Sequence, residues 1–276
     1  MGLEAPPQRR DALYINRPKR AFPFSCNLPA SDWRASDGYD ALLRCDRRAF
    51  AWEWLRRNQI YRSLWAARES LPIDAPKDIG LLGWVDPALA SPQARPIWST
   101  RMDPKVLKGR LATRSAPSAD LFDIRAIAPF VSVEIDADRA EHWLFSDGRW
   151  AIRLDVYGGT LLGGPALIEY QLHGVESARS KLDALRQFLA LSEQGRLPAS
   201  LVPRERRASR WILELRVGDA ILTGATEQDI ARELFKDAIA PKRWRRENAS
   251  YRLRVQRLVR IARHRLAHPL SGPWFE

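Results

Sequence analysis

The chain contains 276 residues, of which 45% are hydrophobic and 28% charged, with a formal net charge of +12, and this composition is typical of a soluble globular protein of about two domains. Its two cysteines, Cys26 and Cys45, exclude a disulfide framework and a cysteine zinc site, and they favour a reducing cytosol. No apolar run reaches the roughly 18 residues of a membrane helix and no signal peptide is recognised, so a cytoplasmic protein without a membrane partner is expected.

Residues 1–29 combine prolines with basic side chains and carry only Glu4 and Asp11 as acids. The basic residues are Arg9, Arg10, Arg17, Lys19 and Arg20. A terminus of this composition rarely orders by itself, so we predict a basic mobile tail. An arm that enters the minor groove of DNA is the alternative.

Residues 30–98 are predicted to form a small helical domain rich in aromatic side chains. Asp46 can cap a helix that carries Phe50 and Trp54, and Asn58 can cap a second helix that carries Tyr61. Because these aromatic residues recur at helical spacing, we interpret them as core residues. A platform for stacking nucleic-acid bases is the alternative.

Residues 99–120 are richer in serine, threonine, alanine and proline, which predicts a flexible linker and a domain boundary. The linker is also basic, with Arg101, Lys105, Lys108, Arg110 and Arg114. The second domain then spans residues 121–276.

Four short segments after this linker alternate partly in the manner of strands and predict a small antiparallel sheet. They are residues 130–135, 142–145, 149–156 and 161–172. The sequence Ser146-Asp147-Gly148 predicts a hairpin turn between the second and the third. Paired glycines at 158–159 and 163–164 lack the lysine and hydroxyl residue of a phosphate loop, so we interpret them as turn glycines.

Catalytic and metal chemistry are not expected. Glu134, Asp136 and Asp138 cluster near a strand end, and because no partner histidine or second acidic cluster is recognised, we interpret them as turn residues rather than a metal-nuclease site. His264 and His268 lie four residues apart beside arginines that would repel a metal cation. No nucleophile is recognised with a matching base, so we expect a protein that is not an enzyme, with no metal and no cofactor.

Two further helices are predicted over residues 177–191 and 207–222. Residues 213–217 also alternate like a strand, but their position shortly before the next helix start favours a helix. Thr226 can cap that next helix, and Asp229 lies three residues on, where its carboxylate can reach back to the cap.

The last predicted helix begins at about Ser250 and carries an apolar stripe and a basic face. The stripe consists of Tyr251, Val255, Leu258, Ala262 and Leu266. The opposite side consists of Arg252, Gln256, Arg257, Arg260, Arg263 and His264, with Leu253 exposed among them.

The pattern of residues 224–268 predicts a helix-turn-helix-like unit. The connection of residues 236–249, with Pro241 and Trp244, is longer than the turn of a standard unit. An extra turn of helix, or a winged or partition-protein-like variant, would account for this length.

The basic residues are concentrated near the end of the chain. Residues 240–268 contain ten lysines and arginines and one acid, Glu247, and ten minus one gives +9 of the +12 net charge. Like charges four residues apart on a helix repel, so this excess predicts a polyanionic partner, and double-stranded DNA is preferred. RNA is disfavoured because aromatic residues do not interleave with the basic ones, and anionic lipid because the apolar face is needed inside the bundle.

The DNA-binding residues follow from this face and from the basic connection before it. The groove-facing set is predicted to be Arg252, Gln256, Arg260 and Arg263, with Arg257 beside them. Phosphate contacts are assigned to Lys242, Arg243, Arg245 and Arg246, and Thr226 completes the interface. Recognition of paired half-sites favours a homodimer.

Several motifs resemble those of a known family. Residues 46–58 (DRRAFAWEWLRRN), with Asp32-Trp33, Tyr39, Tyr61 and Val85-Asp86-Pro87, resemble the transcriptional-regulator domain of alphaproteobacterial proteins. Residues 149–165, the segments Gly224-Ala225-Thr226, Ile230-Ala231 and Leu234-Phe235, and the arginine-rich last helix resemble the C-terminal domain that follows it. The combination is similar to activators carried by integrative and conjugative elements, including frameshift-assembled excision activators, which switch on an excisionase gene. This resemblance implies a DNA-binding C-terminal domain and, as a partner, a small antiactivator built from the same domain.

These expectations combine into an α+β fold, with a small N-terminal helical domain, a small antiparallel sheet and a C-terminal helical bundle that carries the DNA-binding unit. The expected function is a sequence-specific activator at promoter DNA in the nucleoid that controls excision or transfer genes. An antiactivator or partition-like adaptor that acts by protein–protein contact is the alternative, favoured by Leu253 and by the aromatic N-terminal helices. The charge distribution also predicts that a fragment from about Ala112 binds DNA alone. Activation is then expected to need the N-terminal domain, through contacts of Trp52, Trp54 and their neighbours with RNA polymerase or a second subunit.

Overall fold

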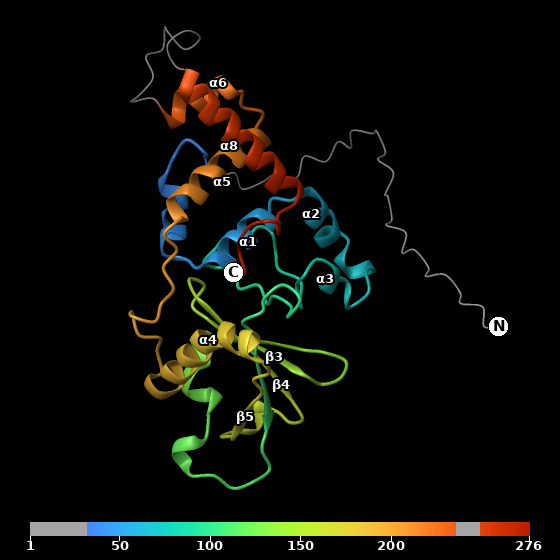
Figure 1. Cartoon of the computed structure of the whole chain (residues 1–276). Helices are drawn as coiled ribbons and strands as arrows, with labels where there is room; N and C mark the ends of the chain where they lie inside the picture. Colours follow the sequence, from blue (N-terminus) through green and yellow to red (C-terminus); the bar gives the residue numbers. More distant parts are fainter. Residues whose placement is uncertain (1–31, 236–248) are drawn as a thin grey trace, which may run out of the picture.

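Figure 1 shows the computed structural model of the chain, which describes residues 32–235 and 249–276. The fold is α+β, as predicted: helices from both ends of the chain gather in one half, and a five-stranded sheet with helix α4 forms the other half. Within the two described ranges, no helix combines the length and the apolar character needed to cross a membrane.

The N-terminal part of the described chain is helical. Its elements are the 3₁₀ helix η1 (Asp37–Arg44), α1 (Arg47–Leu55), α2 (Gln59–Ala66), the 3₁₀ helix η2 (Arg68–Ser70) and α3 (Ala75–Asp78). Asp46 caps α1, because its carboxylate accepts from the backbone N–H of Arg48 (2.9 Å) and of Ala49 (3.3 Å). Asn58 caps α2 by accepting from the N–H of Tyr61 (3.0 Å), so both predicted helix starts are confirmed.

Helix α1 is buried on every side. Phe50, Trp52 and Trp54 have no exposed surface, and the Trp52 indole donates to the carbonyl of Leu89 (2.9 Å) in the loop that covers the helix. The aromatic core predicted for this region is therefore confirmed. The predicted contact of Trp52 and Trp54 with RNA polymerase or a second subunit is wrong, since neither ring reaches the surface.

One hydrophobic core joins the two ends of the described chain. Helix α5 (Ala208–Leu222) runs through it, and the Phe50 ring lies 5.1 Å from the ring of Trp211 and 6.3 Å from that of Trp274. The predicted domains 30–98 and 121–276 thus contribute side chains to the same core.

The sheet has the strand order β2-β3-β4-β1-β5. Its strands are β1 (Leu107–Leu111), β2 (Val131–Ile135), β3 (Glu141–Ser146), β4 (Ala151–Tyr157) and β5 (Ile168–Tyr170), and 3₁₀ helices lie between them at η3 (Ser118–Asp120), η4 (Ile124–Phe130) and η5 (Leu161–Gly163). Strands β2, β3 and β4 are antiparallel, with Trp143 opposite Leu154, so the predicted hairpin is confirmed.

Three features of the sheet differ from the prediction. Of the fourth predicted strand, residues 161–172, only β5 is a strand, and its first residues form η5. The sheet is mixed rather than antiparallel, because β1 pairs in parallel with β4 and only its other edge is antiparallel to β5. Strand β1 also lies inside the segment 99–120 that was expected to be a linker. Leu107 is buried there, and Gly109 lies so close to Ile168 that a Cβ would come within 2.7 Å of that side chain. Lys108 and Arg110 interrupt the apolar pattern of this short strand, so its pairing is decided by packing in the folded chain.

A second core lies between the sheet and helix α4 (Val175–Gln194). The Phe188 ring of α4 lies 5.0 Å from that of Phe122 and 5.2 Å from that of Phe145. The helices predicted over residues 177–191 and 207–222 are confirmed as α4 and α5.

Candidate nucleic-acid interface

Helices α6 (Glu227–Leu234) and α8 (Ala249–Ala267) pack together, and α5 packs on α8 beside them (Figure 1). Thr226 begins α6 with a capping box, as predicted: its hydroxyl accepts from the N–H of Asp229 (3.2 Å), and the Asp229 carboxylate accepts from the N–H of Thr226 (3.1 Å). Residues 236–248, between α6 and α8, lie outside the described part of the chain, so the docking geometry of a helix-turn-helix stays a prediction.

The apolar stripe of the last helix is confirmed. Val255, Leu258 and Ala262 of α8 are buried in the first core, and Val259 joins them. Tyr251 and Leu266 are partly buried at the two ends of the stripe and pack against the same core. This contact fixes the rotation of α8 and therefore determines which side chains it presents to solvent.

The face opposite the stripe is basic. Its exposed side chains are Arg252, Leu253, Arg254, Gln256, Arg257, Arg260, Arg263 and His264. None of Arg252, Arg257, Arg260 and Arg263 forms an ion pair with a residue in the ranges 32–235 or 249–276. All the groove-facing residues predicted from the sequence therefore lie on one solvent-exposed face, and their role in binding DNA stays a prediction.

Helix geometry orders the side chains on this face. At about 100° per residue, Leu253, Arg260 and His264 point most directly away from the buried stripe, and Arg257 lies next to them. Arg252, Gln256 and Arg263 lie along one edge of the face rather than at its centre. Arg257 and Arg260 are therefore the arginines best placed to enter a groove, and Leu253, which is 61% exposed, lies in line with them.

Two arginines of α8 have partners among the residues that the structure describes. The Arg254 guanidinium lies over the ring of Phe235, 4.7 Å from its centroid. Arg265 pairs with Glu214 of α5, whose side chain is completely buried, and stacks over the Trp274 ring at 4.7 Å. Burial lowers the pKa of Arg265, and the charge of Glu214 partly opposes that shift. Arg265 thus holds α8 against α5, although the charge count alone places it with the DNA-facing arginines.

The remaining predicted phosphate contacts, Lys242, Arg243, Arg245 and Arg246, lie outside the described residues. Their position relative to α8 stays a prediction.

The acidic cluster at the end of β2 is a turn joined to a histidine that the sequence pattern did not reveal. Asp136 accepts from the backbone N–H of Asp138 (3.0 Å) and of Ala140 (2.9 Å), so it is the turn residue that was predicted. His142 contacts Asp136 with one ring nitrogen (3.2 Å) and the buried Asp155 with the other (2.9 Å). The premise that no histidine lies near these acids is therefore wrong, because the β2–β3 pairing brings His142 back beside them. In the described part of the chain, no group of three or more histidine, cysteine or carboxylate side chains is placed to hold a metal ion.

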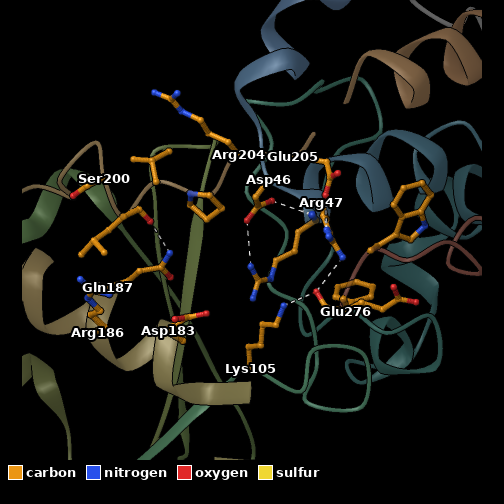
Figure 2. A pocket seen from close by; sticks show the side chains of 17 residues that line it. Asp46, Arg47, Lys105, Asp183, Arg186, Gln187, Ser200, Arg204, Glu205 and Glu276 are labelled. Atoms are coloured by element: carbon orange, nitrogen blue, oxygen red, sulfur yellow. Dashed lines mark hydrogen bonds and ion pairs between the residues drawn. The ribbon is translucent and has the colours of Figure 1, made fainter. Parts of the chain in front are cut away.

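A hollow of about 450 Å³ lies between the two cores (Figure 2). Several of its charged side chains have partners: Arg47 contacts Glu205, Lys105 donates to the backbone carbonyl of Glu276, and Asp46 pairs with Arg48. Burial lowers the pKa of Lys105, and the nearby Arg48 lowers it further. These contacts tie the α4–α5 connection and the last residues to the start of α1, so we interpret the hollow as a junction between the two halves of the fold.

Sequence reasoning also missed a buried ionic link between α1 and α5. Arg57 pairs with Asp219 of α5 and with Glu53 of α1, and Glu53 pairs in turn with Arg56. Burial and the neighbouring Asp219 raise the pKa of Tyr39, so its hydroxyl stays protonated and donates to Asp219 (2.6 Å). No local signal could have identified this link, since Arg57 and Asp219 are 162 residues apart.

Two family models match parts of the chain. Residues 32–82, from before η1 to a few residues beyond α3, match a proteobacterial transcriptional regulator-like domain. Residues 173–268, which include α4, α5, α6 and α8, match the DNA-binding domain described for a T6SS transcription factor. Comparison with curated proteins gives no match. Together the two domains make the chain a DNA-binding transcription regulator, with DNA as its partner.

Proposed function

We propose that this regulator is a non-enzymatic activator that recognises a specific double-stranded DNA sequence with helix α8. The observation that carries the proposal is the exposed arginine face of α8, which has no ion pairs within the described residues and lies in the segment matched by the DNA-binding model. The opposite face of α8 is held in the core, so this orientation does not require a rearrangement on binding.

The position of each side chain on α8 determines the contact that we propose for it. Arg257 and Arg260, at the centre of the face, are proposed to donate to guanine edges in the major groove, a geometry that the planar guanidinium suits. Arg252, Gln256 and Arg263 line the edge of the same face and contact bases or phosphates at the groove wall.

Sequence-independent contacts complete the proposed interface. Lys242, Arg243, Arg245 and Arg246 hold phosphates, and Thr226 at the start of α6 contacts the backbone beside them. Phosphate contacts fix the position of the protein on the duplex, whereas base contacts determine which sequence it prefers.

The test separates these two kinds of contact. After an operator has been selected from random DNA, affinity is measured for Arg257→Gln and Arg260→Gln on the operator and on scrambled DNA at several salt concentrations. Loss of a base contact should weaken operator binding by about 1–3 kcal/mol with little effect on scrambled DNA. Loss of a phosphate contact should weaken both and reduce the salt slope by about one.

Arg125→Gln is the matched control, because Arg125 is an exposed arginine of η4 in the half of the molecule that contains the sheet. Its affinity should equal that of the unaltered chain. Equal losses on operator and scrambled DNA for every α8 variant would refute the groove assignment.

The proposed targets are the excision or transfer genes of an integrative and conjugative element. The resemblance of residues 46–58 and of the C-terminal segments to activators of such elements supports this choice. The matched DNA-binding model, which is described for a T6SS transcription factor, supports secretion genes as the competing target. A genome-wide footprint decides between them: peaks upstream of an excisionase gene support the first, and peaks confined to secretion genes refute it.

A second function is favoured by one observation, the exposed Leu253 at the centre of the arginine face. A leucine there suits contact with a protein as well as with a thymine methyl group. In this alternative the chain is an antiactivator or partition-like adaptor, whose partner is a related small protein or RNA polymerase. A gel-shift titration that gives no specific DNA band, together with a stable protein complex that Leu253→Glu abolishes, would establish it.

A further inference from the structure

Helix α4 presents a second apolar face to solvent. Of the thirteen large hydrophobic side chains that are exposed in the described residues, four lie between positions 172 and 189. Val175, Leu182 and Leu189 are 81%, 54% and 44% exposed and are spaced seven residues apart along α4. The side of α4 that packs on the sheet is a different one, formed by Ala184, Phe188 and Leu191.

This spacing is typical of two helices that pair along their length. We call the line formed by Val175, Leu182 and Leu189 the seam. Side chains seven residues apart lie on one line along a helix, and Leu185 lies beside that line, three residues after Leu182. A hollow of about 360 Å³ accompanies the seam and is lined by Leu182, Leu185, Leu189 and Leu201. Exposed apolar patches of this kind on a soluble protein mark contact surfaces.

Charged side chains flank the seam, with basic residues toward the start of α4 and an acidic residue toward its end. A partner that covers the seam must carry complementary charges in the reverse order. Arg179 and Arg186 lie along its edge, followed one further heptad on by Glu193. Arg179 makes only an exposed contact with Glu176 (3.6 Å), and Glu193 forms no ion pair within residues 32–235 and 249–276.

We propose that a second copy of this chain covers the seam, with the two α4 helices antiparallel about a twofold axis near Arg186. In this arrangement Leu182, Leu185 and Leu189 of each copy interlock, and Arg179 of each copy meets Glu193 of the other. A twofold interface uses the same patch on both copies, so one complementary pair of residues forms two ion pairs.

The charges favour the antiparallel arrangement over the parallel one. A parallel, in-register pair would separate Arg179 of one helix from Glu193 of the other by about 21 Å along the axis and would leave Glu193 without a basic partner. The antiparallel pair contains one contact between like charges, Arg186 with Arg186 of the second copy. Removal of that charge should therefore tighten the dimer, which an unrelated occupant does not predict.

This dimer leaves the DNA-binding face free. Helix α8 lies in the helical half of the molecule and α4 beside the sheet, well apart in Figure 1. Two copies joined through α4 would present two α8 helices to paired half-sites. Only this consequence rests on the proposed function, since the association itself requires no DNA.

The test is the oligomeric state of the full chain without DNA, measured by sedimentation across the micromolar range. The unaltered chain should dimerise, and Leu182→Glu should raise the dimer Kd by about tenfold or more, as expected for loss of a central apolar contact. Arg179→Glu and Glu193→Arg should each weaken the dimer, the double variant should restore it, and Arg186→Ala should strengthen it.

Ile73→Glu is the control, because Ile73 is almost fully exposed on the segment before α3 and lies outside the seam. It should leave the dimer Kd unchanged, and circular dichroism should show that every variant is folded. A monomeric full chain, a dimer unaffected by Leu182→Glu, or a charge-swapped double variant that stays weak would each overturn the proposal. Binding of a single half-site through α8 is measured separately and would survive any of these outcomes.

Discussion

Arg57 and Asp219 form a bidentate ion pair that joins the C-terminal end of α1 to α5. The Arg57 Nε lies 2.6 Å from one carboxylate oxygen and the Nη2 lies 2.8 Å from the other, and both side chains are buried. Arg57 lies in the segment matched by the regulator-like model, and Asp219 in the segment matched by the DNA-binding model. The pair therefore couples the folding of the two matched segments.

We expect Arg57→Ala and Asp219→Ala each to lower the free energy of unfolding by about 3–5 kcal/mol. The first change leaves the buried Asp219 with the neutral Tyr39 hydroxyl and no cation, and the second leaves the buried Arg57 with Glu53 alone. Urea denaturation measures the change. The control is Arg125→Ala, which removes the exposed ion pair with Asp123 and should change the free energy of unfolding far less, because solvent screens that pair. Losses of stability of similar size for the variants of the buried pair and for Arg125→Ala would contradict this account.

The shared core predicts that a fragment of residues 112–276 does not fold by itself. This fragment lacks strand β1 and also Phe50, which packs against Trp211 and Trp274. The charge distribution by itself predicts the opposite, that the fragment binds DNA alone. Circular dichroism and a thermal melt of the fragment decide between the two, and a cooperative melt with operator affinity equal to that of the full chain would refute the structural expectation.

Arg260 and Arg265 lie on the same helix and should respond differently to the same substitution. Arg265→Gln should lower the free energy of unfolding by about 1–3 kcal/mol, since the buried Glu214 would keep only the exposed Arg210 as a partner. Arg260→Gln should change stability by no more than about 0.5 kcal/mol, because its side chain is exposed. Operator affinity measured well below the unfolding temperature should fall for Arg260→Gln. A large stability loss for Arg260→Gln would show that the rotation of α8 is wrong.

The stability of the sheet should depend on pH through His142. Burial alone would lower the pKa of His142, but its contacts with Asp155 and Asp136 outweigh burial, and the pKa is raised. The imidazolium therefore stabilises the fold fully below the unfolded-state pKa of about 6.5, and this stabilisation is lost as the pH rises through the folded-state pKa.

Urea midpoints measured from pH 6 upward should accordingly fall for the unaltered chain, and His142→Gln should remove this part of the slope. The exposed His173, changed to Gln, is the control and should leave the slope unchanged. A slope that persists in His142→Gln would assign the pH dependence to another group.

Thr226→Ala should lower stability by about 1 kcal/mol, because it removes the hydroxyl that accepts from the N–H of Asp229. Thr226→Ser keeps that hydroxyl and should restore the unaltered value. Thermal unfolding measures both variants. If the alanine and serine variants melt together, the hydroxyl does not stabilise the start of α6.

The sequence by itself determined the features that depend on neighbours in the chain. Asp46, Asn58 and Thr226 were identified as helix caps because a cap needs only its own side chain and the next few backbone N–H groups. The buried stripe and the basic face of α8 followed from helical spacing for the same reason. The hairpin between β3 and β4 was marked by Asp147 and Gly148 at its turn.

The tertiary structure alone decided which charges are buried and which segments share a core. Arg57 and Arg265 look like surface arginines in the sequence, but carboxylates 162 and 51 residues away hold them inside. Strand β1 likewise exists because β4 and β5 supply its partners, although its own five residues include two basic side chains. A buried ion pair or a strand pairing is favourable only once the distant partner has excluded water from it. That partner cannot be identified from the residues next to the arginine or the strand in the chain.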